Sequence, residues 1–171
     1  MNTEPLQPIP CQGKSAVLPV ILVDTREQTP LAFTRLPSET ASLATGDYSC
    51  RGLELDIAIE RKSIADLVQS LTTERDRFMR ELQRMRSFPF CRLLVIGGIS
   101  QITTHRYRSN CNPKSVINSL HAIESRGIPV VFSLTKEEGA ILVEDWIWWR
   151  CRHVLRESAK LQNALYAQSL P

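Results

Sequence analysis

Residues 43–67 read LATGDYSCRGLELDIAIERKSIADL, and this stretch decides the fold that the sequence predicts. Residues 43–50 and 53–60 have the form of two strands joined by a turn, because apolar and polar residues alternate along the second of them. Ser63, followed three residues later by Asp66, is typical of the start of a helix. We therefore expect two paired strands that lead directly into a helix.

Apolar runs on either side extend this pattern. The run from Val17 to Val23 is rich in β-branched residues and predicts a strand buried on both faces. Further strands are expected at residues 91–96 and 128–134, and helices at 64–71, from 73, from 112 to about 127 and from 135 beyond 156. The order β, ββ, αα, β, α, β, α predicts an α/β fold, a mixed sheet flanked by helices on both faces.

Composition is that of an ordinary globular protein. The chain has 171 residues, of which 43% are hydrophobic and 23% charged, which suits one domain with a sizeable core. A net charge of +3 is compatible with a polyanionic partner without deciding for one. The five cysteines include no CxxC pair, which argues against a disulfide framework and a zinc site. Neither a signal peptide nor an apolar run of membrane-spanning length is visible, so we expect a cytoplasmic protein.

The ends of the chain differ from its centre. Four prolines among the first nineteen residues predict a flexible N-terminal segment at 1–16. A single domain is expected at 17–157, and a helical extension or tail at 158–171.

Three acids and a lysine fall at the ends of predicted strands. Asp24 ends the first strand, and Asp47 follows a glycine in the next. Glu60 and Lys62 would project to one face of the third strand, because residues two apart on a strand share a face. Acids gathered at one place repel one another unless a cation compensates them, and hard cations such as Mg²⁺ are held by carboxylates.

Each of these residues also has a simpler interpretation. Asp24 could cap a loop, Asp47 could be a turn residue, and Glu60 with Lys62 could form a surface ion pair. Only a shared metal site explains all four together. The set then provides what phosphodiester hydrolysis requires, namely a cation that activates water and an ammonium that stabilises the phosphate.

The same residues carry a resemblance to a known family. Asp24-Thr25-Arg26-Glu27, Gly46-Asp47 and Glu60-Arg61-Lys62-x-x-x-Asp66 occur in the order and at the spacing of the XPF-type structure-specific endonucleases. The resemblance covers roughly residues 18 to 150. It implies a restriction-endonuclease-like fold and cleavage of branched, flapped or bubble DNA, as in DNA repair and recombination.

The resemblance also implies roles for individual residues. Asp24, Asp47 and Glu60 would bind Mg²⁺ or Mn²⁺, with the Arg61 carbonyl as a further ligand and Lys62 catalytic. A supporting set would brace the site: Arg26, Glu27, Arg61 and Asp66. Arg77 would lie close to the scissile strand.

The resemblance stops short of the tandem helix-hairpin-helix domain that many family members carry after the nuclease. A compact bacterial or phage-type, nucleoid-associated nuclease, or one that depends on a partner chain, is therefore expected. The main alternative is a non-catalytic DNA-binding or scaffold subunit. Such members typically lose the motif acids, and this chain keeps them. Cleavage of RNA or of plain duplex DNA would require the same residues.

Two further surfaces are candidates for contacting DNA. Arg77, Arg80 and Arg84 belong to an arginine-rich helix that could bind phosphates, although interspersed acids also allow a solvated face. Arg106 and Arg108 flank Tyr107 in a predicted loop that could hold a strand by charge and stacking, or be an ordinary exposed loop.

The last predicted helix carries Trp146, Trp148 and Trp149. Three tryptophans in four positions cannot all face one core, so we expect a second buried surface there. Members of the family pair through their nuclease domains, which predicts a homodimer, or a pairing with a second nuclease-like or DNA-binding chain. The alternative is an extended core with one exposed indole.

Overall fold

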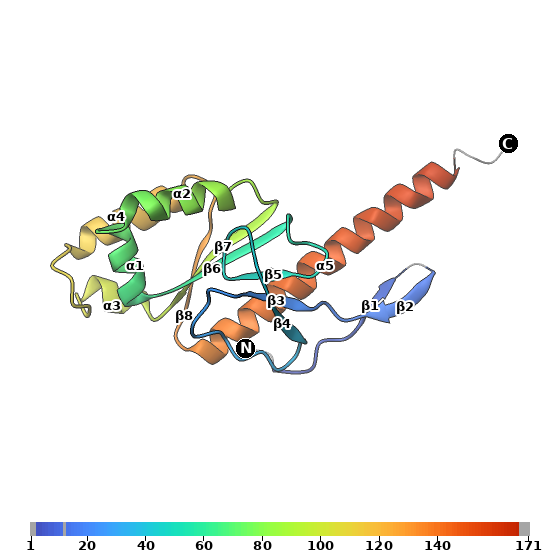
Figure 1. The fold of residues 1–171 in the computed structure, drawn as a ribbon, viewed down its shortest axis with the longest axis horizontal. Coiled ribbons are helices and arrows are strands. Elements are labelled where there is room, and N and C mark those ends of the chain that lie inside the picture. The colour runs from blue at the N-terminus through green and yellow to red at the C-terminus, as the bar shows by residue number, and fades with distance from the viewer. Residues whose placement is uncertain (1–2, 12, 168–171) are drawn as a thin grey trace.

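The structure is a computed structural model, and it describes residues 3–11 and 13–167. Its centre is a six-stranded mixed sheet with the strand order β4-β3-β5-β6-β7-β8 (Figure 1). The strands are β1 (Ile9–Cys11), β2 (Lys14–Val17), β3 (Ile21–Asp24), β4 (Ser38–Ala41), β5 (Tyr48–Cys50), β6 (Ile57–Ser63), β7 (Phe90–Ile96) and β8 (Val130–Ser133). The helices are α1 (Ile64–Leu71), α2 (Arg75–Met85), α3 (Ile99–Thr103), α4 (Pro113–Glu124) and α5 (Lys136–Ala167).

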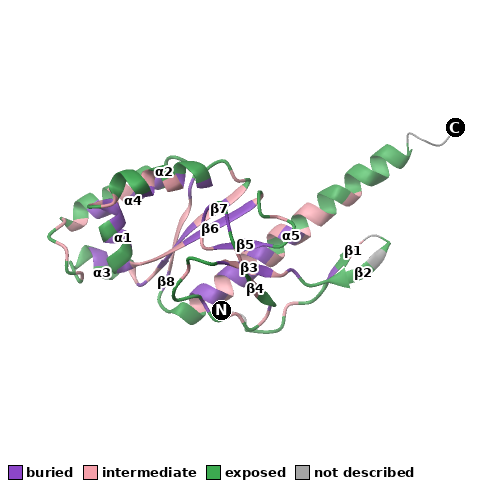
Figure 2. Ribbon diagram, in the orientation of Figure 1, coloured by how far each residue is buried: buried purple, intermediate pink, exposed green. Residues whose placement is uncertain are grey.

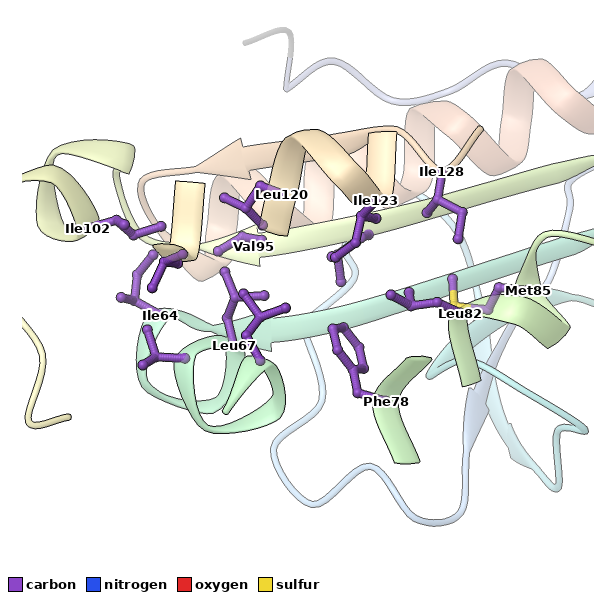
Figure 3. Packing of buried hydrophobic residues seen from close by; sticks show 14 of the residues in the cluster. Ile64, Leu67, Phe78, Leu82, Met85, Val95, Ile102, Leu120, Ile123 and Ile128 are labelled. Atoms are coloured by element: carbon purple, nitrogen blue, oxygen red, sulfur yellow. The ribbon is translucent and has the colours of Figure 1, made fainter. Parts of the chain in front are cut away.

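Helices cover both faces of the sheet, as the sequence predicts. On one face, α1, α2 and α4 pack against Leu93 and Val95 of β7 (Figure 3). On the other face, α5 packs against Leu94 of the same strand, together with residues of β3 and β5. Side chains alternate along β7 because successive residues of a strand point to opposite faces. The predicted α/β architecture with a mixed sheet is confirmed.

The first predicted strand is broken in two. Residues 9–11 and 14–17 form an antiparallel hairpin, β1 with β2, within what the sequence suggested was a flexible lead-in. The central sheet begins only at Ile21. Pro19 lies between the two strands, and proline has no backbone N–H to donate to a ladder, so the apolar run from Val17 cannot continue as one strand.

The predicted strand at 53–60 begins later than expected. Leu53 to Asp56 form a turn in which the Asp56 N–H donates to the Leu53 carbonyl at 3.0 Å, and Leu55 is 81% exposed. The strand itself runs from Ile57 to Ser63 and is parallel to β7 throughout. Glu60 and Lys62 therefore lie inside the strand rather than beyond its end, with both backbones fixed by the sheet.

The predicted starts of α1 and α4 are confirmed by side-chain caps, whereas α2 begins at Arg75 without one. Ser63 Oγ accepts the Asp66 N–H at 3.2 Å, and Asn112 Oδ1 accepts the Lys114 N–H at 2.8 Å. Phe78, Leu82 and Met85 form the buried face of α2 (Figure 3). Besides the β1–β2 hairpin, two elements are additional to the prediction, the short polar strand β4 and the helix α3.

The helix α5 is much longer than the sheet is wide. Its first half is buried against the sheet, and its second half is exposed beyond it (Figure 2). Across residues 3–11 and 13–167, no helix is both long and apolar enough to cross a membrane.

Candidate functional site

The three predicted acids lie on neighbouring strands and point to the same face of the sheet. Asp24 ends β3, Asp47 directly precedes β5, and Glu60 lies within β6. The residues paired across these strands belong to the core under α5: Val23, Tyr48 and Ile59. Because side chains alternate, the three acids face the other side, toward α1 and α2.

Gly46 brings Asp47 close to β6. Its φ of +79° is one that side-chain-bearing residues rarely adopt, and a Cβ there would lie 3.0 Å from the Ile59 carbonyl oxygen. The Asp47 N–H donates to that same carbonyl at 2.8 Å. The Arg61 N–H donates to Asp47 Oδ2 at 2.7 Å. Gly46 thus lets the Asp47 carboxylate lie beside Glu60 and Arg61.

Asp24 is held by its own chain. Its carboxylate accepts the Arg26 Nε–H at 2.6 Å, the Arg26 backbone N–H at 2.9 Å and the Leu43 N–H at 2.7 Å. Burial alone would raise the pKa of Asp24, but these hydrogen bonds outweigh it and hold the pKa below its usual value. The Asp24 side chain is 1% exposed, whereas that of Arg26 is 69% exposed.

Glu60 is in the opposite situation. Burial, followed by the charge of Asp47, raises the pKa of Glu60 to about 8, although Lys62 pairs with its Oε1. Glu60 Oε2 is buried and has no hydrogen-bond partner. A buried acceptor without a partner is costly, so this oxygen is available to a cation or a proton.

Lys62 stands between the acids and α2. Its Nζ lies 5.6 Å from the centroid of the Phe78 ring, and Glu60 and Lys62 share a face of β6, as the two-residue spacing predicts. Burial would lower the pKa of Lys62, but the charge of Glu60 raises it overall, so the ammonium stays protonated. Burial likewise raises the pKa of Asp47, to about 6.

The expected supporting residues brace this arrangement. Arg61 makes a two-pronged ion pair with Glu27, with Nε to Oε2 at 3.0 Å and Nη2 to Oε1 at 2.9 Å. Both side chains are nearly buried, so the loop after β3 is fixed to β6. Asp66 is exposed, and its carboxylate accepts a hydrogen bond from Ser63 Oγ at 2.7 Å, which closes the cap of α1.

Asp47, Lys62 and the supporting residues open onto a polar cleft of about 480 Å³, whereas the buried Asp24 and Glu60 are not among the residues that line it. The loop after β3, the strand β6 and the helices α1 and α2 all contribute to its walls. The lining residues are Arg26, Glu27, Gln28, Thr29, Asp47, Arg61, Lys62, Asp66, Gln69, Ser70, Glu74 and Arg77.

The donor set fits a divalent cation in part. Among residues 3–11 and 13–167, no group of three or more Asp, Glu, His or Cys side chains is arranged to hold a metal ion. Asp47 and Glu60 repel each other, and Glu60 has the unpartnered oxygen, whereas Asp24 is bound to Arg26. Because Mg²⁺ usually takes one or two carboxylates and completes its shell with water and phosphate, this pair is a suitable core for such a site.

The comparisons with known proteins show the family to which this chain belongs. The ERCC4 domain model matches residues 23–145, which is most of the chain. This chain belongs to the ERCC4 domain family. The resemblance to XPF-type nucleases seen in the sequence is thereby confirmed.

Two solved structures show that the fold of this ERCC4 domain is shared. XPF from Aeropyrum pernix is 21% identical, with a TM-score of 0.62 over 75% of this chain and 60% of that one. XPF from Aeropyrum pernix in complex with DNA is also 21% identical, with a TM-score of 0.62 over 78% of this chain and 66% of that one. The chain thus spans less than two thirds of these relatives. No curated protein sequence matches it.

The expected DNA-binding arginines of the ERCC4 domain are spread over two regions. Arg77 lines the cleft and pairs with Glu74, while Arg80 and Arg84 are exposed on α2 outside the cleft lining. Arg106 and Arg108 are exposed in the loop after α3. Arg108 lines a second hollow with Tyr107, and that hollow shares Gln69 with the main cleft.

Glu81 lies near the candidate site, a position that the sequence did not indicate. It lies one helical turn after Arg77 on α2, is half-buried, and its charge acts on Arg26, Glu60 and Lys62. From the sequence, Glu81 could be interpreted only as one of the acids that balance the charge of the arginines on this helix. Its spacing of four residues from Arg77 was the available signal, because such residues share a helix face.

Proposed function

We propose that this ERCC4 domain is a divalent-metal-dependent endonuclease that hydrolyses phosphodiester bonds in branched or flapped DNA. The observation that carries the proposal is the buried Glu60, whose Oε2 lacks a partner and which lies beside Asp47 and Lys62, two residues that line a polar cleft. A similar fold is known in complex with DNA, which supports DNA as the partner. A DNA substrate also agrees with the expected cytoplasmic, nucleoid-associated location.

Asp47 and Glu60 would hold Mg²⁺ or Mn²⁺, with Asp24 joining them when its carboxylate leaves Arg26. The ion supplies positive charge against the phosphate and makes a nearby water more acidic. Lys62, which stays protonated beside Glu60, donates hydrogen bonds to the phosphate or orients the attacking water. The Glu27–Arg61 pair keeps the Arg61 N–H on Asp47, and so fixes the direction of that carboxylate.

The shape of the surface supports a substrate with a single-stranded arm. Gln69 of α1 lines both the main cleft and the hollow that contains Tyr107 and Arg108. A strand that leaves a duplex at the cleft could follow this path, held by arginine charge. We therefore assign Arg77 to the scissile strand and Arg108 to the arm beyond it.

The test is cleavage of end-labelled flap, fork and linear duplex DNA in Mn²⁺. We expect faster cleavage of the branched substrates, and a loss of about 100-fold or more in Asp47→Asn and Lys62→Met. Glu124→Gln, which changes an exposed acid on α4, is the matched control and should cut at the wild-type rate. Equal cutting by wild type and Asp47→Asn would end the proposal.

Other outcomes would separate the alternatives. Tight DNA binding without cleavage in either Mg²⁺ or Mn²⁺ would indicate a scaffold subunit. Equal cutting of linear and branched DNA would remove the junction preference and leave the nuclease. Arg108→Ala should weaken binding of the flap more than of the linear duplex, and Arg86→Ala, from the end of α2, serves as its control.

We also propose that two copies of the chain pair through α5. Trp149 is 59% exposed, and Leu161, Leu165 and Tyr166 further along the helix are 61%, 57% and 72% exposed. Trp148 is half-buried, with Nε1 donating to the Gln7 carbonyl at 2.8 Å, so Trp149 is the exposed indole that is left for a second surface. Exposed apolar side chains along one helix are typical of an association surface.

Molar mass in solution tests this pairing. The wild type should elute as a dimer in light-scattering chromatography at micromolar concentration, and Leu165→Glu combined with Trp149→Ser should shift it toward the monomer. His153→Glu, an exposed change on the same helix, is the control for added charge. A monomeric wild type at the highest soluble concentration would refute the pairing.

A further inference from the structure

Two cysteines from distant parts of the chain meet beneath α5. Cys50 ends β5 and Cys151 lies on α5, 101 residues later, yet their sulfur atoms are 3.3 Å apart. Both are thiols in this structure, as are Cys11, Cys91 and Cys111. Cys50 is 1% exposed and Cys151 is 8% exposed, so the contact is almost completely enclosed by protein.

The geometry is close to that of a covalent link. A disulfide places its sulfur atoms about 2 Å apart. The two sulfur atoms would therefore need to approach each other by only about 1 Å for the bond to form. Cys91, the remaining buried cysteine, instead lies near the Gly127 carbonyl, at 3.9 Å, and has no such neighbour.

Although both cysteines are buried, they lie beside a groove through which a small molecule can approach them. A groove of about 500 Å³ runs between α5 and the start of the central sheet, and both sulfur-bearing residues line it. Its other walls are largely apolar, from Ile9, Leu18 and Leu155. The hydrogen bond from Cys50 lowers the pKa of Cys151 and outweighs its burial, which favours Cys151 as the attacking thiolate.

We propose that Cys50 and Cys151 are a modification site, at which a low-molecular-weight disulfide converts the two thiols to a reversible intramolecular disulfide. The Cys151 thiolate attacks one sulfur of the small disulfide, forms a mixed disulfide and releases one small thiol. Cys50 then loses its proton and attacks the Cys151 sulfur, which releases the second small thiol. Two electrons and two protons pass from the protein to the reagent.

The link would join α5 covalently to the strand that follows Asp47. The closed loop contains β6, β7, β8 and the helices α1 to α4, and so spans most of the domain. A crosslink over so long a loop restricts the unfolded chain, and oxidation should therefore raise the urea concentration at the midpoint of unfolding. This inference does not depend on the proposed nuclease activity.

The experiment treats the native full chain with cystamine, followed by alkylation and intact mass measurement. We expect a Cys50–Cys151 peptide that dithiothreitol separates, with both of its cysteines unalkylated before reduction, whereas the half-exposed Cys11 and Cys111 can carry cystamine adducts. Cys50→Ser should stop at a stable cystamine adduct on Cys151, whereas Cys91→Ser should form the link normally.

Unfolding in urea provides a second measurement. The midpoint of the wild type should rise after oxidation, and that of Cys50→Ser should not. Five alkylated cysteines after cystamine treatment, or a mapped disulfide between other cysteines, would overturn the proposal. Because these outcomes are read on the wild type itself, they hold even if a variant folds poorly.

Discussion

At the scale of single residues, the acids of the site differ in how fully their carboxylate oxygens are hydrogen-bonded. Asp24 receives hydrogen bonds on both carboxylate oxygens, whereas Glu60 has a buried oxygen with none. The two acids face the same side of the sheet, so the contrast comes from Arg26, which follows Asp24 by two residues. Arg26 therefore decides whether Asp24 can serve as a metal ligand.

Arg26→Ala tests this role of Arg26. Removing the guanidinium leaves Asp24 buried without its counter-charge, and should cost about 1 kcal/mol in the free energy of unfolding, since Arg26 is 69% exposed. We expect Mn²⁺ to raise the melting temperature of this variant more than that of the wild type, because the cation finds a third carboxylate free. An equal rise in both proteins would exclude Asp24 as a ligand.

Gly46→Ala tests the close approach between Asp47 and β6. Alanine would adopt a positive φ and would also press its Cβ on the Ile59 carbonyl oxygen, 3.0 Å away. We expect a loss of about 2–3 kcal/mol in urea unfolding. Gly52→Ala is the matched control, since Gly52 has a φ of +80° but no atom within 4 Å of the added Cβ. Equal losses in both variants would show that the contact with Ile59 contributes nothing.

The sequence predicted much of the site at this scale, but not its internal pairing. Strand periodicity placed Glu60 and Lys62 on one face, and the structure has them there. The bond between Arg26 and Asp24, and the half-buried position of Glu81, depend on side-chain directions in three dimensions. Residue spacing does not contain that information.

At the scale of elements, α5 is fixed to the loop before β4 by a buried acid. Glu144 Oε1 accepts the N–H groups of Thr34 and Arg35 at 2.9 and 2.6 Å, and Oε2 accepts Arg35 Nε at 3.0 Å. One carboxylate thus satisfies several donors of a loop that has no sheet partner of its own. A buried network of this kind is costly to break at one member.

Glu144→Gln should destabilise the protein strongly. It removes the charge opposite Arg35, whose side chain is only 5% exposed, and should cost about 3 kcal/mol in the free energy of unfolding. Asp145→Asn removes the second partner of Arg35, but Asp145 is 37% exposed, so a loss below about 1 kcal/mol is expected. Urea unfolding followed by tryptophan fluorescence measures both, and similar losses would contradict this assignment.

Elements with strong periodicity or caps were predicted well, and polar or interrupted ones were not. α2 and α4 follow from their apolar spacing and from Asn112-Pro113. β4 has the sequence SETA, which shows no alternation of apolar and polar residues. It forms a strand because its backbone pairs in parallel with β3 at the edge of the sheet. Leu53 and Leu55 give the turn at 53–56 the apolar alternation of a strand. The turn lies outside the sheet because β5 pairs with β6 at a register that joins Tyr48 to Ile59.

At the scale of the whole molecule, the raised pKa values of two acids predict how stability depends on pH. Asp47 titrates near 3.8 and Glu60 near 4.5 when unperturbed, whereas in the folded protein their pKa values are about 6 and about 8. Between these values the folded state binds more protons than the unfolded state. The free energy of unfolding of metal-free protein should therefore fall as pH rises from about 4 to about 8.

Urea unfolding in EDTA at several pH values measures this dependence. Glu60→Gln cannot ionise at this position and should show a flatter fall above pH 6, and Mn²⁺ should oppose the fall in the wild type. Stability that rises over this range in the wild type, without metal, would contradict the conclusion that burial outweighs the partners of these two carboxylates.

If the chain has the proposed nuclease activity, the exposed guanidinium of Arg26, which pairs with the buried Asp24, would link the binding of a phosphate to that of a cation. A phosphate that reached the cleft would compete for Arg26, and the withdrawal of Arg26 would leave a negative charge that attracts a cation. Thermodynamic reciprocity would then require each ligand to tighten the binding of the other by the same factor. Such a domain would bind the cation weakly in the absence of nucleic acid and tightly in its presence. Nucleic acid would therefore complete the metal site that cleaves it.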